Sequence, residues 1–265
     1  MTKKTLLLLA YLAVSFYLNA QQPNWDSLSK EAAKTEIYKP VPPVITPGAR
    51  PQDAPSDAIV LFNGKNLDAW YGDDSTKAPG WDIADGIMTV NKKMGGIMTK
   101  QKFMDYQLHL EWRIPTNITG NSQARGNSGV FLAYLGMKDK LFEMGYEIQI
   151  LDNYKNDTYV NGQVGSLYKQ YIPLANACKQ PGEWQTYDII WKAPRFNSNG
   201  SLKSPAYLTA IHNGVLVQDH VEVKGQTLWI GKPFYKAHGP SPIRLQSHGD
   251  PSEPISYRNI WIRPL

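Results

Sequence analysis

Residues 146–152 of this chain alternate apolar and polar side chains, and the polar positions carry groups that can do chemistry. Successive side chains of a strand point to opposite faces, so Glu147 and Gln149 share one face while Ile148 and Ile150 share the other. A carboxylate can give or take a proton, and an amide can hold the hydroxyl groups of a ligand. We therefore expect this strand to form one wall of a groove.

Two further segments have the same pattern. The polar face of residues 106–114 carries Gln107, His109, Glu111 and Arg113. The polar face of residues 243–248 carries Arg244, Gln246 and His248. If all three strands belong to one sheet, their polar faces build a common groove. If they do not, these are solvated outer faces that carry ion pairs, and the alternation fits both arrangements.

Loops beside these strands supply further candidates. Residues 125–129 enter a strand and include Arg125, Asn127 and Ser128, together with two glycines that allow close approach to a ligand. Tyr168 lies in a second glycine-containing loop, which follows residues 146–152. The alternative for each loop is an ordinary turn.

The composition limits the class of protein. Residues 1–20 combine Lys3 and Lys4 with an apolar stretch and predict a signal peptide cleaved near Ala20; a retained N-terminal anchor is the alternative. We therefore expect an exported protein, periplasmic or secreted, with no membrane span in the mature chain. Cleavage lowers the formal charge of +5 by two, and the absence of a basic stripe argues against nucleic acid as a partner. The only cysteine, Cys178, excludes a disulfide framework.

The mature chain divides into two parts. Residues 21–56 are rich in proline and predict an arm or linker, with a short helix near residues 27–35. Residues 57–265 predict one domain of short strands. The predicted strands are 59–62, 81–84, 87–90, 97–99, 106–114, 129–134, 146–151, 186–191, 207–211, 215–221, 243–247 and 256–262.

Turn signals connect some of these strands directly. Asp85-Gly86 and Asn213-Gly214 each predict a tight hairpin, because a type I′ turn needs residues that accept a positive φ. Many short strands in one domain predict an all-β sandwich or jelly roll. Eight Trp and 15 Tyr suit such a core, and they also suit stacking on sugar rings.

Seven motifs, in order along the chain, resemble the 3-keto-disaccharide hydrolase domain family. They are LFNGKNL at 61–67, GNSGV at 126–130, YEIQILD at 146–152, GEWQTYD at 182–188, NGVLV at 213–217, IRLQSHG at 243–249 and RNIWI at 258–262. The resemblance covers residues 57–265 and implies a concanavalin-like jelly-roll β-sandwich of two antiparallel sheets, related to lectins and glucanases. It also implies export from the cell, a carbohydrate substrate and cleavage of glycosides already oxidised to a ketone at C3.

Two mechanisms compete for such a site. A conventional glycosidase needs two carboxyl groups about 5–9.5 Å apart, whereas Glu147 and Asp152 would be roughly 16 Å apart on a straight strand, with their side chains on opposite faces. Alternatively, the C3 ketone acidifies the C2 proton, and a base then starts an elimination that expels the C1 oxygen. Hydration of the product gives net hydrolysis. This mechanism needs one base, one electrophile and one acid.

The elimination mechanism suggests a role for each candidate residue. Glu147 or His248 serves as the base, and Arg258 or Arg125 stabilises the enolate. The predicted substrate-binding residues are Arg125, Asn127, Ser128, Gln149, Asp152, Tyr168, Gln246 and Glu111. No cofactor is required, although a divalent metal held by His248, Glu147 and Asp152 could replace the arginine.

Two other functions stay open at this stage. A non-catalytic glycan-binding module fits the aromatic content equally well, and a conventional two-carboxylate glycosidase of glucanase type shares the expected fold. No feature of the sequence indicates an oligomeric state.

Overall fold

The computed structural model describes residues 23–138 and 142–265, which fall into two compact units, Met1–Val44 and Ile45–Leu265. The predicted signal peptide lies outside the described residues. In the first unit, α2 (Trp25–Ala32) continues into the 3₁₀ turn η1 (Ala33–Thr35), and the Asn24 side chain caps α2 by accepting from the Ser27 N–H. The helix therefore begins two residues before the predicted segment.

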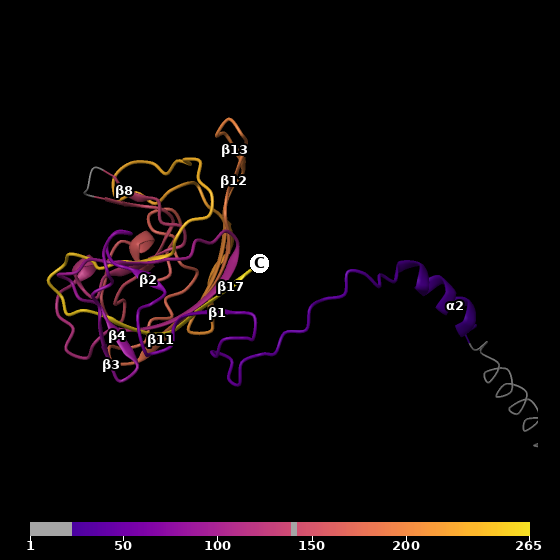
Figure 1. The fold of residues 1–265 in the computed structure, drawn as a ribbon, viewed down its shortest axis with the longest axis horizontal. Coiled ribbons are helices and arrows are strands. Elements are labelled where there is room, and N and C mark those ends of the chain that lie inside the picture. Colours follow the sequence, from indigo (N-terminus) through magenta and orange to yellow (C-terminus); the bar gives the residue numbers. More distant parts are fainter. Residues whose placement is uncertain (1–22, 139–141) are drawn as a thin grey trace, which may run out of the picture. The chain divides into compact units, whose positions relative to one another are not determined.

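The second unit is a jelly-roll β-sandwich of two antiparallel sheets, as predicted (Figure 1). The larger sheet has the order β15 (Val215–Glu222), β14 (Tyr207–His212), β11 (Trp184–Lys192), β6 (Tyr106–Arg113), β17 (Ser256–Pro264), β4 (Ile87–Thr89), β3 (Asp82–Ala84), with β1 (Ile59–Phe62) paired to β17. The smaller sheet has the order β10 (Glu147–Ile150), β7 (Ser128–Phe131), β16 (Arg244–Leu245), β5 (Ile97–Thr99), β2 (Trp70–Tyr71).

Shorter elements complete this unit. The hairpins β8 (Gly136–Lys138)–β9 (Phe142–Met144) and β12 (Arg195–Phe196)–β13 (Leu202–Ser204) stand outside both sheets, and η2 (Ser122–Ala124) and η3 (Val160–Gly162) are single 3₁₀ turns. The sequence did not predict these hairpins or β2, because their strands are too short to show alternation. Both predicted tight turns are present, with φ of 52° and 77° at Asp85 and Gly86, and 52° and 80° at Asn213 and Gly214.

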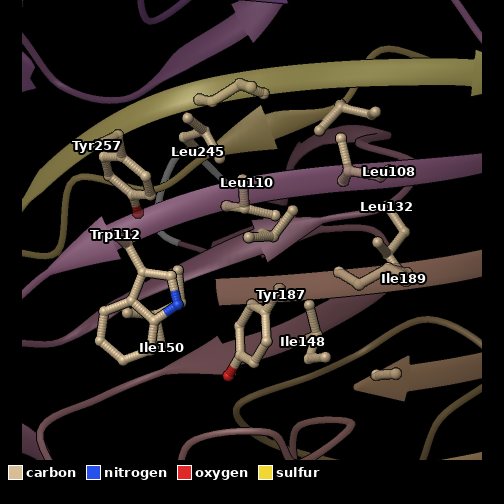
Figure 2. Packing of buried hydrophobic residues seen from close by; sticks show 14 of the residues in the cluster. Leu108, Leu110, Trp112, Leu132, Ile148, Ile150, Tyr187, Ile189, Leu245 and Tyr257 are labelled. Atoms are coloured by element: carbon tan, nitrogen blue, oxygen red, sulfur yellow. The ribbon is translucent and has the colours of Figure 1, made fainter. Parts of the chain in front are cut away.

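The core lies between the inner faces of the two sheets (Figure 2). Leu110 and Trp112 of β6 and Ile189 of β11 pack toward Ile148 and Ile150 of β10, and all five side chains are fully buried. Burying each of these side chains contributes roughly 1.5–3 kcal/mol. This packing fixes which side of β10 faces inward, and therefore which side faces out.

Two tyrosine hydroxyls link the two sheets on the core side of β10 and β7. The Tyr187 hydroxyl, on β11, donates to the backbone carbonyl of Gln149 at 2.6 Å. The Tyr106 hydroxyl, on β6, donates to the carbonyl of Leu132 at 2.6 Å just beyond β7. These cross-sheet bonds hold β10 and β7 in place from the core side.

The second unit includes part of the proline-rich segment that we expected to be an arm. The backbone of Thr46 bonds with Ser56, and the Gln52 carbonyl accepts from Asn259 Nδ2 and Trp261 Nε1, both at 2.9 Å. By its internal contacts, the compact unit begins at Ile45. Over the described ranges, no helix has the length and apolar character to cross a bilayer.

Candidate functional site

A cavity of about 640 Å³ opens on the outer face of the five-stranded sheet. That volume falls within the range of ligand pockets, roughly 300–1,000 Å³. Glu147 lies opposite Phe131 and Gln149 opposite Gly129 in the β10–β7 pairing, while Arg244 lies opposite Phe131 in the β16–β7 pairing. The alternation therefore brings the polar face of residues 146–152 and that of residues 243–248 to one groove, as we expected.

Glu147 is the most perturbed acid in this cavity. Burial raises the pKa of its carboxyl well above the ordinary value, and the negative charge of Glu143 adds to the shift. A β-carbon at Gly129 would collide with the Glu147 carboxyl, so the glycine makes room for this side chain. With its amide nitrogen turned toward Glu147, Gln149 donates to Oε1 at 3.2 Å. The raised pKa favours the protonated form of Glu147, which suits it to act as a general acid.

His248 enters the same cavity from the loop after β16 and is oriented by Asp250. Its Nδ1 lies 2.9 Å from Asp250 Oδ2, and Asp250 also accepts from the Ser252 N–H at 2.9 Å and from Lys92 Nζ at 3.3 Å. Burial opposes ionisation of Asp250, but the hydrogen bonds from His248 and Ser252 lower its pKa to about 2. An ionised Asp250 requires a proton on His248 Nδ1, which leaves Nε2 as a base.

Arg244 is the only Arg or Lys among the described residues that line the cavity. Its Nε lies 2.5 Å from Glu143 Oε1 and its Nη2 lies 2.7 Å from Asp73 Oδ1. Burial lowers the pKa of Arg244, but these carboxylates outweigh it, so the pKa is raised and the guanidinium stays charged. Gln246 donates to Glu143 Oε2 at 2.5 Å, which completes an ordered polar wall.

Amides form the opposite wall. In the other orientation of its amide, Gln149 Nε2 lies 3.2 Å from Gln123 Oε1 and 3.3 Å from Asn127 Oδ1, and all three side chains line the cavity. Asn127 Nδ2 also donates to the Gln123 carbonyl at 2.8 Å. Neutral donors and acceptors in this density suit the hydroxyl groups of a sugar.

Aromatic rings stand at the rim of the cavity. The hydroxyls of Tyr159 and Tyr168 are 2.5 Å apart, and the ring centroids of Phe142 and Trp229 are 5.5 Å apart. Burial raises the pKa of Tyr168, and its hydrogen bond to Tyr159 adds to the shift, so its hydroxyl remains protonated. Such rings offer apolar faces on which a pyranose can pack.

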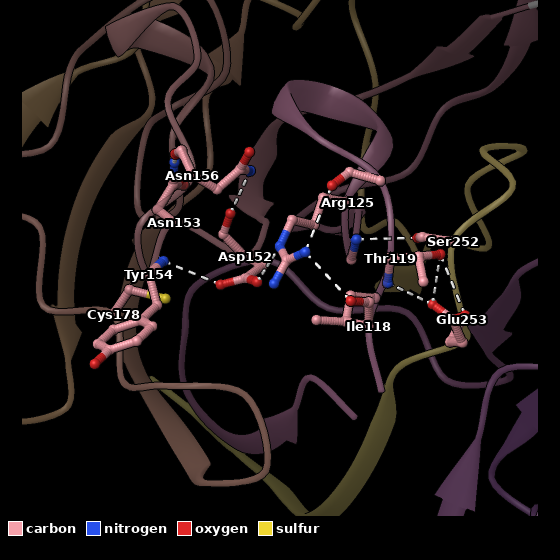
Figure 3. Close-up of polar contacts among 12 residues, drawn as sticks. Ile118, Thr119, Arg125, Asp152, Asn153, Tyr154, Asn156, Cys178, Ser252 and Glu253 are labelled. Carbon is pink, nitrogen blue, oxygen red and sulfur yellow. Dashed lines mark hydrogen bonds and ion pairs between the residues drawn. The ribbon is translucent and has the colours of Figure 1, made fainter. Parts of the chain in front are cut away.

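Four predicted substrate-binding residues, Arg125, Ser128, Asp152 and Glu111, do not line this cavity. Arg125 Nε instead bonds Asp152 Oδ2 at 2.7 Å, and Asp152 also accepts from the Tyr154 N–H at 3.0 Å (Figure 3). This pair fastens the loop before β7 to the end of β10. Ser128 is on the core face of β7, where its Oγ donates to the Gln246 carbonyl at 2.7 Å. Alternation explains the last error, since Ser128 lies opposite Ile150.

Glu111 and Arg258 belong to the other sheet. They lie on neighbouring strands β6 and β17, where Arg258 Nε bonds Glu111 Oε2 at 2.6 Å on the outer face of the eight-stranded sheet. Periodicity predicted correctly that this face of β6 is polar, but it could not tell to which sheet the strand belongs. Neither residue lines the cavity around Glu147.

Sequence reasoning also missed residues of the site. Glu143 and Asp73 lie on a short hairpin and a loop that have no periodic pattern, and Arg244 was recognised as sharing the polar face but was not assigned a role. Tyr159, Phe142 and Trp229 are scattered aromatics that the sequence does not single out. In the part of the chain that the structure describes, no three His, Cys, Asp or Glu side chains are grouped to hold a metal ion, and Asp152 is engaged by Arg125.

Comparison with known proteins identifies the family. Residues 57–263 match the model of the 3-keto-alpha-glucoside-1,2-lyase-like domain, and the chain belongs to this family. A protein of Parabacteroides distasonis ATCC 8503 named as a candidate glycosyl hydrolase, solved at 2.13 Å, is 56% identical with a TM-score of 0.80, over 88% of this chain and 96% of that chain. No curated protein matches the chain.

More distant structures agree with this assignment. A second candidate glycosyl hydrolase of that organism, solved at 2.00 Å, is 26% identical with a TM-score of 0.55, over 78% of this chain and 99% of that chain. A third, solved at 1.70 Å, is 18% identical with a TM-score of 0.56 over 79% and 94%, a likeness that shows the fold alone. Family and relatives together support a carbohydrate-active role.

Proposed function

We propose that this member of the family is a lyase that cleaves the glycosidic bond of 3-keto-glycosides by elimination across C1 and C2. The observation that carries the proposal is the pairing, in one cavity, of a buried acid of raised pKa, Glu147, with a histidine oriented by a carboxylate, His248. An elimination next to a ketone needs one acid and one base, and it needs no pair of free carboxylates. The family description supports the same chemistry.

Each residue has a role in the proposed reaction. His248 Nε2 takes the C2 proton, and the C2–H electron pair forms an enolate whose negative oxygen at C3 is stabilised by the Arg244 guanidinium. The enolate then collapses: the C3 ketone re-forms, a C1–C2 double bond forms, and the C1–oxygen bond breaks. Glu147 gives its proton to the leaving oxygen. Hydration of the double bond in a later step gives net hydrolysis.

The remaining polar side chains would bind the sugar. Gln149, Asn127 and Gln123 are placed to hold ring hydroxyls, and Tyr168 and Trp229 contribute ring faces at the rim. We also propose that the protein acts after export, because residues 1–20 have the pattern of a signal peptide.

Deuterium exchange separates the two steps of the proposed reaction. Wild-type protein, Glu147→Gln and His248→Ala are incubated with a 3-keto-disaccharide in D₂O, and products and C2 deuterium are followed by mass spectrometry and NMR. Glu147→Gln should lose cleavage yet still exchange the C2 proton, because only C–O cleavage needs the acid. His248→Ala should lose both reactions. Glu183→Gln, an exposed change outside the cavity, is the control.

The position of Glu143 supports a second candidate function, that of a conventional glycosidase. It lines the same cavity as Glu147, and its charge raises the pKa of Glu147, so the two could form the acid and base of a conventional glycosidase. Against this, Glu143 already accepts from Arg244 and Gln246. Release of sugar from unoxidised glycosides, lost in Glu143→Gln, would establish the conventional enzyme. Binding with no product from either substrate type would indicate a glycan-binding module.

A further inference from the structure

A second cavity, of about 630 Å³, opens on the outer face of the eight-stranded sheet. Glu111, Thr186 and Arg258 come from the adjacent strands β6, β11 and β17, and residues 50–54 form one side of the opening. None of its lining residues belongs to the cavity around Glu147, which lies on the other sheet. This cavity contains Glu111 and Arg258, two predicted site residues to which the proposed reaction gives no role.

Arg258 is held ready for a ligand in this cavity. Its guanidinium lies over the Trp184 ring, 4.1 Å from the ring centroid, and its Nε donates to Glu111 Oε2 at 2.6 Å. Among the described residues, its two terminal nitrogens make no hydrogen bond to the protein. An oriented guanidinium with free terminal N–H groups is suited to take a carboxylate through two parallel hydrogen bonds.

Glu111 does not cancel this positive charge at the opening. Burial opposes its ionisation, but hydrogen bonds from His109, Asn259 and Arg258 lower its pKa to about 2. The buried carboxylate is thus satisfied inside the protein and fixes the position of Arg258. Arg50 and Lys179 also line the cavity and are exposed, but Arg50 is paired with Asp53 at 2.8 Å, so Arg258 and Lys179 supply the positive charge of this cavity.

Apolar surface lies beside these charges. Val60 is 48% exposed, the half-buried Trp184 ring carries the guanidinium groups of Arg258 and Arg113, and Trp261 is anchored by its bond to Gln52. A sugar ring can pack its C–H face on such a wall while a charged substituent reaches the arginine. The size of the cavity suits one or two sugar rings and not an extended polymer groove.

We infer that this cavity is a second carbohydrate site, distinct from the proposed catalytic site, which binds an oligosaccharide bearing uronic acid carboxylates. The unpaired guanidinium N–H groups of Arg258 and the exposed Lys179 contact the carboxylate, and Val60 contacts the ring. Such a site would hold the protein on acidic glycans and would act independently of the reaction at the other sheet.

Calorimetric titration of the full chain with tetragalacturonate tests this inference, and the uncharged methyl ester of the same tetrasaccharide is the matched ligand. The acid should bind, more weakly at high salt because part of the attraction is between exposed charges. The ester should bind at least about tenfold more weakly, since it loses the charge-assisted hydrogen bonds. Lys179→Glu should raise the Kd by about fivefold.

Two variants separate this site from the other one. Arg258→Gln should raise the Kd about tenfold or more, and a thermal melt checks that Glu111 tolerates the change. Glu147→Gln should bind tetragalacturonate like the wild type, and Lys179→Glu should retain wild-type activity on a 3-keto-disaccharide. Equal affinity for acid and ester would overturn the inference, as would unaltered binding in Lys179→Glu or the absence of saturable binding of the acid.

Discussion

Glu147 occupies a position that stability alone does not favour. A carboxyl group in water ionises near pH 4.3, whereas burial holds the pKa of Glu147 well above that in the folded protein. Between these two pKa values the unfolded chain has released the proton and the folded one has not, so stability falls as pH rises. A residue that lowers stability at neutral pH inside a cavity is a strong candidate for function.

Glu147→Gln should therefore separate activity from stability. The neutral amide cannot ionise, so the variant should gain stability relative to the wild type at pH 8, and this gain should be much smaller near pH 4, where most of the unfolded wild-type chain also keeps the proton. Cleavage should fall about 10²–10⁴-fold with the loss of a general acid. Urea unfolding at both pH values measures the first effect. A variant less stable than the wild type at pH 8 would show that the carboxylate is ionised and stabilising.

Asp250 acts on the reaction through His248, as a positioning residue. In Asp250→Asn the amide can donate to Nδ1, which favours the tautomer with the proton on Nε2 and removes the base. We expect kcat to fall about 10²–10⁴-fold with little change in KM, and C2 deuterium exchange to fall equally.

The ionisation of Asp250 itself should not appear in the activity profile. Its pKa is held at about 2, so the stability it contributes is fully present above its unfolded value near pH 3.9 and is lost only as pH falls toward 2. Measurements of kcat at pH 5–9 therefore report on the other groups of the site. A variant that keeps wild-type deuterium exchange would show that Asp250 has only a structural role at Ser252 and Lys92.

At the level of strands, β7 determines the position of the Glu147 carboxyl group. Gly129 lies opposite Gln149 in the pairing with β10, and a methyl group there would meet the end of the Glu147 side chain. Because that end is flexible, Gly129→Ala should cost little stability while displacing the carboxyl, and a displacement of about 1 Å costs about 10²-fold in rate. Gly239→Ala, where the space is open, is the control. Unchanged kcat in Gly129→Ala would mean that the carboxyl position is not critical.

The same strands show what the sequence can predict. Strict alternation in residues 146–150 and 243–246 correctly placed Glu147, Gln149 and Gln246 on one face. The face of β6 was also predicted, but sheet membership depends on contacts between distant segments, and it separated Glu111 from this site. Glu143 could not be predicted, because its three-residue strand is too short to show a pattern and its side chain is placed by contacts with the distant residues Arg244 and Gln246.

At the scale of the whole molecule, the N-terminal boundary of the second unit can be tested by deleting residues on either side of it. Every described residue from 23 to 44 is exposed, so these residues supply no buried side chain, and we expect a chain that begins at Ile45 to fold as the second unit does. Deleting residues 1–56 also removes the Gln52 carbonyl, which accepts from Asn259 and Trp261 over the outer face of the eight-stranded sheet. The first deletion should therefore leave the Tm of the jelly roll unchanged.

The longer deletion should be measurably less stable. Losing two hydrogen bonds and their packing costs about 2 kcal/mol, which lowers the Tm by roughly 4–8 °C in a domain of this size. It should also weaken the binding of tetragalacturonate, because residues 50–54 form one side of the second cavity, while cleavage of a 3-keto-disaccharide at the other sheet is retained at 25 °C. Calorimetric melts of both deletions provide the comparison. Equal Tm values would place the start of the folded domain at residue 57, because residues 45–56 would then contribute nothing to its stability.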